Sequence, residues 1–374
     1  MPGETAISAL LQRLVAFRTD RSEVVQAEWL RTWARALGAQ VRLDDVQPGR
    51  VNFLATFAGD DPTRTLLFEA HGDTVGGDVP MRLDAEAGLL YGRGTCDNKA
   101  ALAAIMTAIQ RVVGAHRRPP VTVLFASTCR EESGGEGVKA LLASGVRADV
   151  AVVGEPTRLV PIRAHKGAWR CRIVTHGVAA HSSNPSRGDN AIYRMRRVLE
   201  TLETRYPEWL MSRRDPVLGA PTMSVGTIHG GMAVNIVPEH CEIEVDWRLV
   251  TGLRGEDILA DLHAALPGIE ITPCEEYPAY SEPDASPALA LARRACKIAL
   301  GRVPEPGVVA WAANAGFFCE AKMPSVLFGP GDIAQAHTAG EFVELRQVEQ
   351  TADVYEQMIL QAGNIIAKQG RKNE

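Results

Sequence analysis

A histidine and five acidic residues come at or just after the ends of short apolar runs in the first half of the chain. They are His71, Asp73, Asp97, Glu131, Glu132 and Glu155. Imidazole and carboxylate groups form a common ligand set for zinc and also suit cobalt or manganese. Carboxylates packed together without a cation would repel one another and lose solvation. The set therefore predicts a site for two divalent metal ions.

Each member of this set has a simpler explanation when it is taken alone. His71 and Asp73 can end a strand whose chain then turns at Gly76 and Gly77. The segment "REES" (130–133) can be a solvated turn. Only the repetition of such residues after successive strands favours a metal site over these alternatives.

Strand-like and helical segments alternate around the candidate ligands. Residues 65–73, 119–132 and 148–157 have the apolar, β-branched composition of buried strands. Residues 98–116 and 135–145 have the composition and end signals of helices. This alternation predicts an α/β fold with a mostly parallel sheet, in which ligands bind at the carboxyl ends of the strands.

The pattern changes in the middle of the chain. Residues 167–183 and 240–250 alternate polar and apolar side chains, as half-buried strands do, and amphipathic helices are expected at 190–206 and 255–266. After residue 287 the α/β pattern returns. We therefore predict a metal-binding catalytic domain interrupted by a smaller α+β domain, formed by residues 1–167 with 283–374 and by residues 168–282, respectively.

Composition narrows the class of protein and its partners. The chain has 374 residues, of which 46% are apolar and 23% charged, with a net charge of −5. The absence of a basic surplus argues against a nucleic-acid partner. No apolar run approaches the roughly 18 residues of a membrane span, and the N-terminus lacks the pattern of a secretory signal. The seven cysteines are widely spaced and odd in number. They favour a reducing cytoplasm over a disulfide framework.

Seven motifs, taken in order, resemble those of the acetylornithine deacetylase, succinyl-diaminopimelate desuccinylase, aminoacylase and carboxypeptidase family. They are "HGDT", "GRGTCDNKAALAA", "CREESGGEG", "VVGEPT", "HKGAWRCRIVTHGVAAHSSNPSRGDNAI", "GGMAVNIVPEHCEIEVDWR" and "FGPGDIAQAHTAGEFVE". The similarity runs from about residue 67 to about residue 345 and is strongest to acetylornithine deacetylase-like members. It implies a zinc-exopeptidase-like catalytic domain with an inserted lid and dimerisation domain.

The resemblance also implies how two metal ions would be held. One ion would bind His71 and Glu155, the other would bind Glu132 and His337, and Asp97 would bridge them. Nothing in the residues alone singles out His337 among nine histidines. The ions would be zinc first, with cobalt or manganese as alternatives.

The resemblance implies that three further residues take part in catalysis. Asp73 would orient His71 by bonding its second ring nitrogen, as carboxylates commonly do behind metal-bound histidines. Glu131 would be the general base that takes the proton of the water between the two metals. His181, in the inserted domain, would stabilise the oxyanion in the active site of a partner subunit.

The substrate implied by the resemblance is a small N-acyl amino acid or a dipeptide. Asn235, Arg248 and Gly329 are the candidate substrate-binding residues, and Arg248 suits a carboxylate because its guanidinium binds in a bidentate manner. A surface salt bridge is the alternative explanation for Arg248. The inserted domain, 168–282, would form a homodimer.

Three departures from the family pattern leave the substrate open. Arg130 and Asn314 stand where acids are common, and Gly340 replaces an acid before Glu341. The leading hypothesis is a metal-dependent hydrolase that cleaves the amide of an N-acyl amino acid. A dipeptidase or carboxypeptidase of the same family and a catalytically inactive dimeric binding protein are the alternatives.

Overall fold

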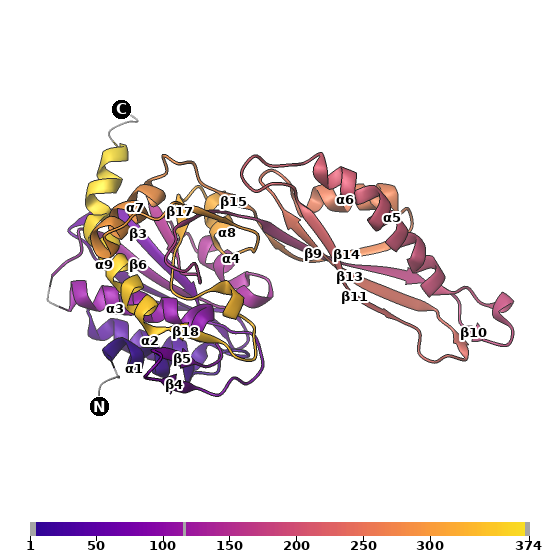
Figure 1. Cartoon of the computed structure of the whole chain (residues 1–374), viewed down its shortest axis with the longest axis horizontal. Helices are drawn as coiled ribbons and strands as arrows, with labels where there is room; N and C mark the ends of the chain where they lie inside the picture. Colours follow the sequence, from indigo (N-terminus) through magenta and orange to yellow (C-terminus); the bar gives the residue numbers. More distant parts are fainter. Residues whose placement is uncertain (1–4, 115–116, 371–374) are drawn as a thin grey trace. The chain divides into compact units, whose positions relative to one another are not determined.

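The computed structural model describes residues 5–114 and 117–370. By their contacts these residues form two compact units (Figure 1), each with its own hydrophobic core. The first unit comprises residues 1–163, 282–307 and 313–374, and the second comprises residues 164–281 and 308–312. The predicted domains differ from these units chiefly at 308–312. This segment joins the second unit because the Lys166 amide donates to the Val309 carbonyl at 3.2 Å.

The first unit is built on a sheet whose centre is parallel and whose edges are antiparallel. Its strands run in the order β1-β2-β6-β3-β7-β17-β8-β15, and β16 pairs with β8. The four central strands, which are mutually parallel, are β6 (Val121–Thr128), β3 (Asp61–His71), β7 (Val150–Val153) and β17 (Ser325–Leu327). The others are β1 (Gln40–Gln47), β2 (Arg50–Phe57), β8 (Ile162–His165), β15 (Tyr280–Ser281) and β16 (Gly307–Val309). By residue range, β15 and the later residues of β8 and β16 are counted with the second unit. The structure therefore has the predicted α/β class.

Helices cover this sheet and close its core. They are α1 (Ala6–Val15), α2 (Val24–Ala36), α3 (Ala100–Val113), α4 (Glu136–Ala143), α7 (Pro287–Leu300), α8 (Ala315–Glu320) and α9 (Leu345–Gly370). The Ala-rich α3 packs against α9, because its small side chains allow close approach. Helix α9 also packs on β3 through Tyr355 and Phe68, whose ring centroids are 5.1 Å apart. A three-stranded sheet of β18 (Phe342–Glu344), β5 (Leu89–Tyr91) and β4 (Arg82–Asp84) completes the unit.

The predicted elements coincide with observed ones, but several end early, and the strands predicted at 148–157 and 167–183 stop at Val153 and His176. The helix predicted at 98–116 is α3, and positions 115 and 116 lie outside the described residues. The strand predicted at 119–132 ends at Thr128, and the short 3₁₀ helix η2 (Glu131–Ser133) follows. The strand stops because the Glu131 and Glu132 amides bond a side chain rather than a neighbouring strand.

The second unit is an antiparallel sheet with two helices along one face (Figure 1). Its order is β11-β13-β9-β14, with strands β11 (Thr222–Gly230), β13 (His240–Leu249), β9 (Gly167–His176) and β14 (Glu270–Tyr277). The helices are α5 (Ala191–Met211) and α6 (Gly255–Ala265). The core lies between helices and sheet, where Trp247 packs on Tyr206 with ring centroids 5.0 Å apart. A separate pair of short strands joins β10 (Ala180–His181) to β12 (Ile236–Val237).

Candidate dimetal site

The predicted metal ligands and the predicted base all lie near the carboxyl ends of the central strands. They are His71 at the end of β3, Asp97 before α3, Glu131 and Glu132 after β6, Glu155 after β7 and His337 after β17. Because parallel strands end at one edge of a sheet, residues far apart in sequence meet there.

The first group of ligand atoms consists of His71, Asp97 and Glu155. One ligand-type atom from each residue lies within 4.8 Å of the others, and all three side chains are buried. His71 Nε2 donates to Asp97 Oδ1 at 2.8 Å. Glu155 Oε1 is buried without a hydrogen-bond partner. A cation between these atoms would satisfy the orphaned oxygen and the imidazole nitrogen together.

The second group consists of Asp97, Glu132 and His337, again within 4.8 Å of one another. His337 Nε2 lies 2.9 Å from Glu132 Oε2 and 3.4 Å from Asp97 Oδ2. Asp97 thus offers Oδ1 to the first group and Oδ2 to the second. A carboxylate placed in this way can bridge two ions, so the residues present fit a dinuclear centre.

The buried carboxylates of the cluster would be stabilised by added positive charge. Burial raises the pKa of the Glu131 and Glu155 carboxyl groups well above their ordinary value. Burial also acts to raise the pKa of Asp97, but hydrogen bonds from His337 and His71 outweigh it and hold that pKa below its usual range. Hydrogen bonds to Asp97 and Glu132 raise the pKa of His337 to about 10.

His337 also has an uncommon backbone conformation. Its φ is 63°, in the left-handed region that costs a non-glycine residue on the order of 1 kcal/mol. Such strain gathers at functional sites, where the surrounding structure holds it in place. This conformation supports a functional role for a histidine that only the family resemblance had singled out.

Asp73 orients the site differently from the prediction. His71 Nδ1 donates to the main-chain carbonyl of Asp73 at 3.0 Å, whereas the nearest carboxylate oxygen is 3.7 Å away. The Asp73 carboxylate instead accepts the backbone amides of Glu131 at 3.0 Å and Glu132 at 3.2 Å. Arg50 Nη2 lies 3.8 Å from the same carboxylate. Asp73 therefore positions the predicted base and one predicted ligand through their main chain.

Glu341 is a site residue to which the sequence analysis gave no role. Its carboxylate accepts from the Gly94 amide at 3.0 Å, the Cys96 amide at 3.0 Å and the Asp97 amide at 3.1 Å. It also accepts from Arg93 Nη1 at 2.8 Å. Glu341 thus fixes the turn that presents Asp97. The available signal was an acid four residues after His337, which by spacing alone predicts nothing specific.

Gly329 packs closely on the backbone of Glu155. It is buried, and a Cβ atom at this position would come within 2.5 Å of the Glu155 carbonyl oxygen. Thr157 holds the backbone of Gly329 in position, since its hydroxyl accepts a hydrogen bond from the Gly329 amide at 3.0 Å. The absence of a side chain at 329 therefore leaves room for the backbone that carries Glu155.

The three departures from the family pattern have different structural settings. Arg130 does not neutralise the predicted base, because its guanidinium donates to Glu136 at 2.9 Å and to the Ser133 carbonyl at 2.8 Å. Asn314 is buried and bonds Glu69. Gly340 is exposed, and a Cβ there would meet open space, so nothing in the structure requires glycine.

Two predicted residues meet in the second unit. His181 pairs with Ile236 across the β10–β12 ladder, and the Ser182 amide donates to the Asn235 carbonyl at 3.0 Å. The Ser183 amide donates to His181 Nδ1 at 3.1 Å, so Nδ1 acts as an acceptor. The proton of a neutral ring is then on Nε2, which makes that nitrogen an exposed donor.

Arg248 lies elsewhere in the same unit, near the end of β13. Its Nε atom is 2.8 Å from Asp246 Oδ1, an ion pair within one strand. The salt bridge considered as the alternative explanation is therefore present. Arg248 is about a third exposed, so its guanidinium remains accessible.

Sequence comparison defines the class to which this site belongs. The family model for "Peptidase family M20/M25/M40" matches residues 67–361. The acetylornithine deacetylase of Proteus mirabilis is 32% identical over 362 residues, covering 91% of each chain. That of Myxococcus xanthus is 32% identical over 372 residues, covering 92% of this chain and 94% of the relative.

Solved structures have the same fold at lower identity. A family M20 metallo-carboxypeptidase from Sulfolobus solfataricus is similar with a TM-score of 0.80 and 17% identity, covering 96% of this chain and 99% of its own. A tripeptidase from Staphylococcus aureus gives a TM-score of 0.76 and 21% identity, covering 96% and 98%.

The chain is a metal-dependent hydrolase that acts on amides. It belongs to the M20/M25/M40 peptidase family. A Bacillus subtilis protein of similar fold, with a TM-score of 0.66 and 14% identity, covering 95% of this chain and 99% of its own, is described as a dinuclear metal binding peptidase of the M20 family. Within residues 5–114 and 117–370, no helix combines the length and the apolarity that a bilayer crossing needs.

Proposed function

We propose that this chain hydrolyses the amide bond of an N-acyl amino acid and releases a carboxylate and a free amine. The observation that carries the proposal is the pair of ligand groups that share Asp97, with Glu131 directly beside the ligand Glu132. The relatives named acetylornithine deacetylase support this reaction over cleavage of a peptide.

The donor sets favour two divalent ions, with zinc as the first expectation and cobalt or manganese as alternatives. His71 and Glu155 would hold one ion, Glu132 and His337 the other, and Asp97 both. When bound, these ions supply Lewis-acid polarisation of the amide carbonyl and increase the acidity of a water molecule.

Glu131 acts as the general base in this mechanism. The Asp73 carboxylate accepts the main-chain amides of Glu131 and Glu132, which fixes the backbone that carries the base next to this ligand. The Glu131 carboxylate takes the proton of the attacking water and then returns it to the leaving amine nitrogen. The two proton transfers require one carboxylate to reach first the oxygen of the water and then the amine nitrogen, and a fixed backbone at Glu131 favours this.

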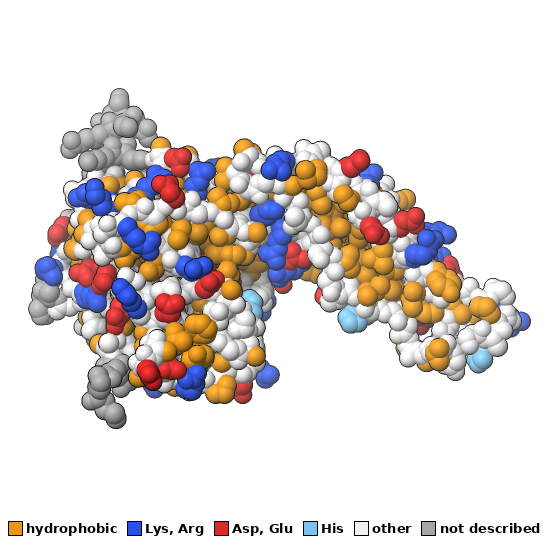
Figure 2. Space-filling model, in the orientation of Figure 1, with side chains coloured by type: hydrophobic (Ala, Val, Ile, Leu, Met, Phe, Trp, Pro, Cys, Tyr) orange, Lys and Arg blue, Asp and Glu red, His pale blue; other side chains and the backbone are white. Residues whose placement is uncertain are grey.

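The second unit of a partner subunit would complete the site, as the family resemblance implies for His181, and the same unit would form the subunit interface. His181 offers Nε2–H to the developing oxyanion, and Asn235 and Arg248 bind the substrate, with Arg248 exchanging Asp246 for the substrate carboxylate. Orange patches mark hydrophobic side chains on the visible face of this unit (Figure 2). Among the exposed apolar side chains are Met232, 85% exposed, and Val234, fully exposed. Together with the edge strand β11, they support a homodimer through this unit.

Substitution of Glu131 tests the proposed mechanism. Glu131→Gln keeps the shape but removes the base, so kcat should fall about 10²- to 10⁴-fold while metal content and Tm stay unchanged. Glu86→Gln, on the exposed surface, is the matched control. Substantial activity in Glu131→Gln would reject the assigned base.

A substrate panel tests the proposed reaction. Acetyl-, succinyl- and peptidyl-amino acids are assayed with zinc, cobalt and manganese. Highest kcat/KM on an N-acetyl amino acid supports the proposal, whereas preference for dipeptides would favour the dipeptidase alternative. Bound metal without activity on any of these amides would favour an inactive binding protein.

The dimer is tested by sedimentation equilibrium. Val234→Asp should weaken association, because it places a charge in an apolar contact, while the metal content of each chain stays the same. Ile298→Asp, at an exposed position on α7, is the matched control. A wild-type chain that sediments as a monomer would contradict the dimer.

A further inference from the structure

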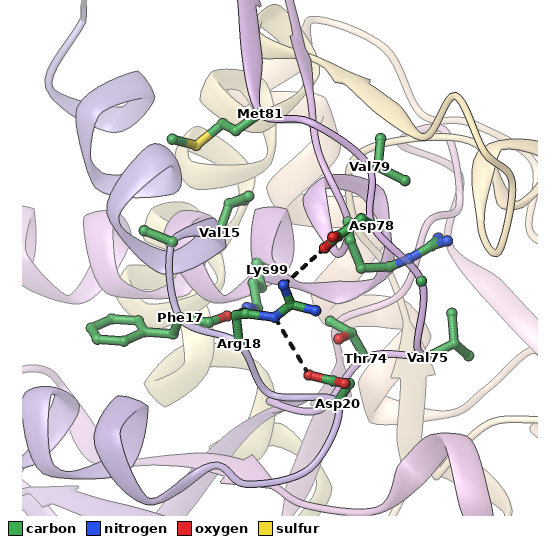
Figure 3. Close-up of a pocket in the computed structure, with 13 residues that line it drawn as sticks. Val15, Phe17, Arg18, Asp20, Thr74, Val75, Asp78, Val79, Met81 and Lys99 are labelled. Atoms are coloured by element: carbon green, nitrogen blue, oxygen red, sulfur yellow. Dashed lines mark hydrogen bonds and ion pairs between the residues drawn. The ribbon is translucent and has the colours of Figure 1, made fainter.

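A cavity of about 110 Å³ lies in the first unit between the loop after α1 and the loop after β3 (Figure 3). Its walls come from residues 15–20 and 74–81, with Arg93 and Lys99. The catalytic mechanism above uses neither of these two cations. The cavity therefore raises the question of what a lysine and an arginine do at its wall.

Lys99 is a buried ammonium group without a carboxylate partner. Its side chain is 1% exposed, and its one hydrogen bond goes to the main-chain carbonyl of Phe17. Among the described residues, no carboxylate oxygen lies within the 4.0 Å of an ion pair with Lys99. Gly94 leaves room for the Lys99 stem, since a Cβ atom at 94 would lie 3.3 Å from its Cδ.

The neighbouring carboxylates are already engaged. Glu341 accepts from three backbone amides and from Arg93. Asp78 pairs with Arg18 at 2.9 Å, and Asp20 lies 4.0 Å from the same guanidinium, the two contacts drawn as dashed lines in Figure 3. Neither side of the cavity therefore supplies Lys99 with a counter-ion.

A purely structural role explains only part of this geometry. The Phe17 carbonyl lies just beyond the C-terminal end of α1, where a cation is favourable to the helix dipole. That contact uses one of the three ammonium N–H groups. Burial of this group with its other donors unsatisfied lowers the pKa of Lys99 to about 7, and an anionic acceptor in the cavity would offset that loss of solvation.

Arg93 supplies a second unsatisfied donor at the same cavity. Its Nη1 atom bonds Glu341, but its Nε atom is buried and has no hydrogen-bond partner. The wall carries three cationic side chains, Arg18, Arg93 and Lys99, and two acidic ones, Asp20 and Asp78. Arg18 is paired with Asp78 and Arg93 with Glu341, so Lys99 is the one cation of this wall without an ion pair among the described residues, and a single unpaired cation suits a monovalent anion.

We propose that this cavity is a binding site for a small monovalent anion, a halide or a short monocarboxylate, held by the Lys99 ammonium with the Arg93 Nε–H as second donor. The volume exceeds what one water needs and is too small for an amino-acid substrate. The bound anion would join the loop at 15–20 to the loop that follows Asp73. The site is independent of the reaction proposed above.

Anomalous diffraction from wild-type crystals soaked in sodium bromide tests the site directly. A bromide peak within hydrogen-bonding contact of Lys99 Nζ is the expected result. Bromide peaks elsewhere on the protein, with only water or no density beside Lys99, would overturn the proposal. This test does not depend on any variant folding.

Thermal shift of the metal-loaded full chain gives the selectivity. Chloride, acetate and phosphate are titrated at constant ionic strength against gluconate, which is too large for the cavity. Chloride or acetate should raise Tm in a saturable way, and Lys99→Met should weaken this response at least about tenfold. Lys139→Met, which removes an exposed lysine that also bonds a main-chain carbonyl, should respond like wild type. Equal responses in wild type and Lys99→Met, or a response to phosphate alone, would contradict the proposal.

Discussion

Asn314 Nδ2 donates a hydrogen bond to Glu69 Oε1 at 3.0 Å in the interior of the first unit. The Thr128 hydroxyl donates to the same oxygen at 2.6 Å. Both Asn314 and Glu69 are buried. The amide at 314, where an acid is common in the family pattern, is thus matched to a carboxylate on β3. An acid at 314 would bring two carboxylates together without a cation.

Asn314→Asp should therefore destabilise the protein by about 3 kcal/mol, because it buries a second carboxylate against Glu69. Adding Glu69→Gln should recover most of this loss. The amide introduced at position 69 would then donate to the carboxylate introduced at position 314, which reverses the roles in the wild-type bond. Urea denaturation of the four members of this double-mutant cycle measures the coupling. Asn184→Asp, on the surface, is the control, and additive effects in the cycle would contradict the pairing.

Glu341→Gln should lower metal content and activity together. The amide side chain offers a single acceptor oxygen where the carboxylate receives three backbone amides and Arg93, so the turn carrying Asp97 loosens. We expect metal affinity to fall about 10- to 100-fold, as for other groups that support ligands. Metal titration measures this effect, with Glu344→Gln as the nearby control. Unchanged affinity would show that Glu341 does not position Asp97.

His337→Ala should reduce the bound metal from about two ions to about one per chain, because it removes a ligand from only one of the two groups. Elemental analysis of dialysed protein measures the ratio, and His240→Ala provides an exposed histidine as control. Loss of both ions would indicate that the two sites fill only together. Retention of both would remove His337 from the ligand set.

The buried His165 should make stability depend on pH. Burial lowers the pKa of His165 to about 4. The folded state therefore keeps this ring neutral while the unfolded chain takes up a proton below about pH 6.5. Its contribution is present above pH 6.5, declines as pH falls and is lost by about pH 4. Between pH 7 and 5 the free energy of unfolding should drop by on the order of 2 kcal/mol.

The His165→Asn variant isolates this dependence. Asparagine keeps an N–H for the Lys166 carbonyl, which His165 Nδ1 bonds at 2.9 Å, but does not titrate. Its stability should change less between pH 7 and 5 than that of wild type. Tryptophan fluorescence follows the transition, because Trp169, Trp209 and Trp247 lie in the same unit. His263→Asn is the exposed control, and a slope equal to that of wild type in His165→Asn would contradict the assignment.

The fold class and the grouping of the ligands could be predicted from the sequence because both follow from local patterns. Apolar runs ending in His71 or Glu155 are strong strand signals, and parallel strands bring their ends to one edge. His337 was different, because a loop histidine has no periodic pattern and its left-handed backbone cannot be seen in sequence. Only the resemblance to a family could select it.

The remaining features depend on three-dimensional contacts between residues far apart in sequence. The Glu341 contacts span 244 to 248 positions, and the Asn314–Glu69 bond spans 245. The sequence suggested the Asp73 carboxylate as the partner of His71, whereas the main chain turns after β3 so that the Asp73 carbonyl is the nearer acceptor and the carboxylate lies 3.7 Å away. Gly329 was assigned to the substrate, yet the structure packs it on Glu155. Local sequence patterns contain none of this information.

Asp73 holds three residues of the site in place, and this constrains how the site can move during turnover. The Asp73 carbonyl holds the His71 ring, and its carboxylate holds the amides of Glu131 and Glu132. Any displacement of the loop after β6 must carry the base and its neighbouring ligand along together. The distance between the base Glu131 and the ligand Glu132 therefore stays the same when this loop moves.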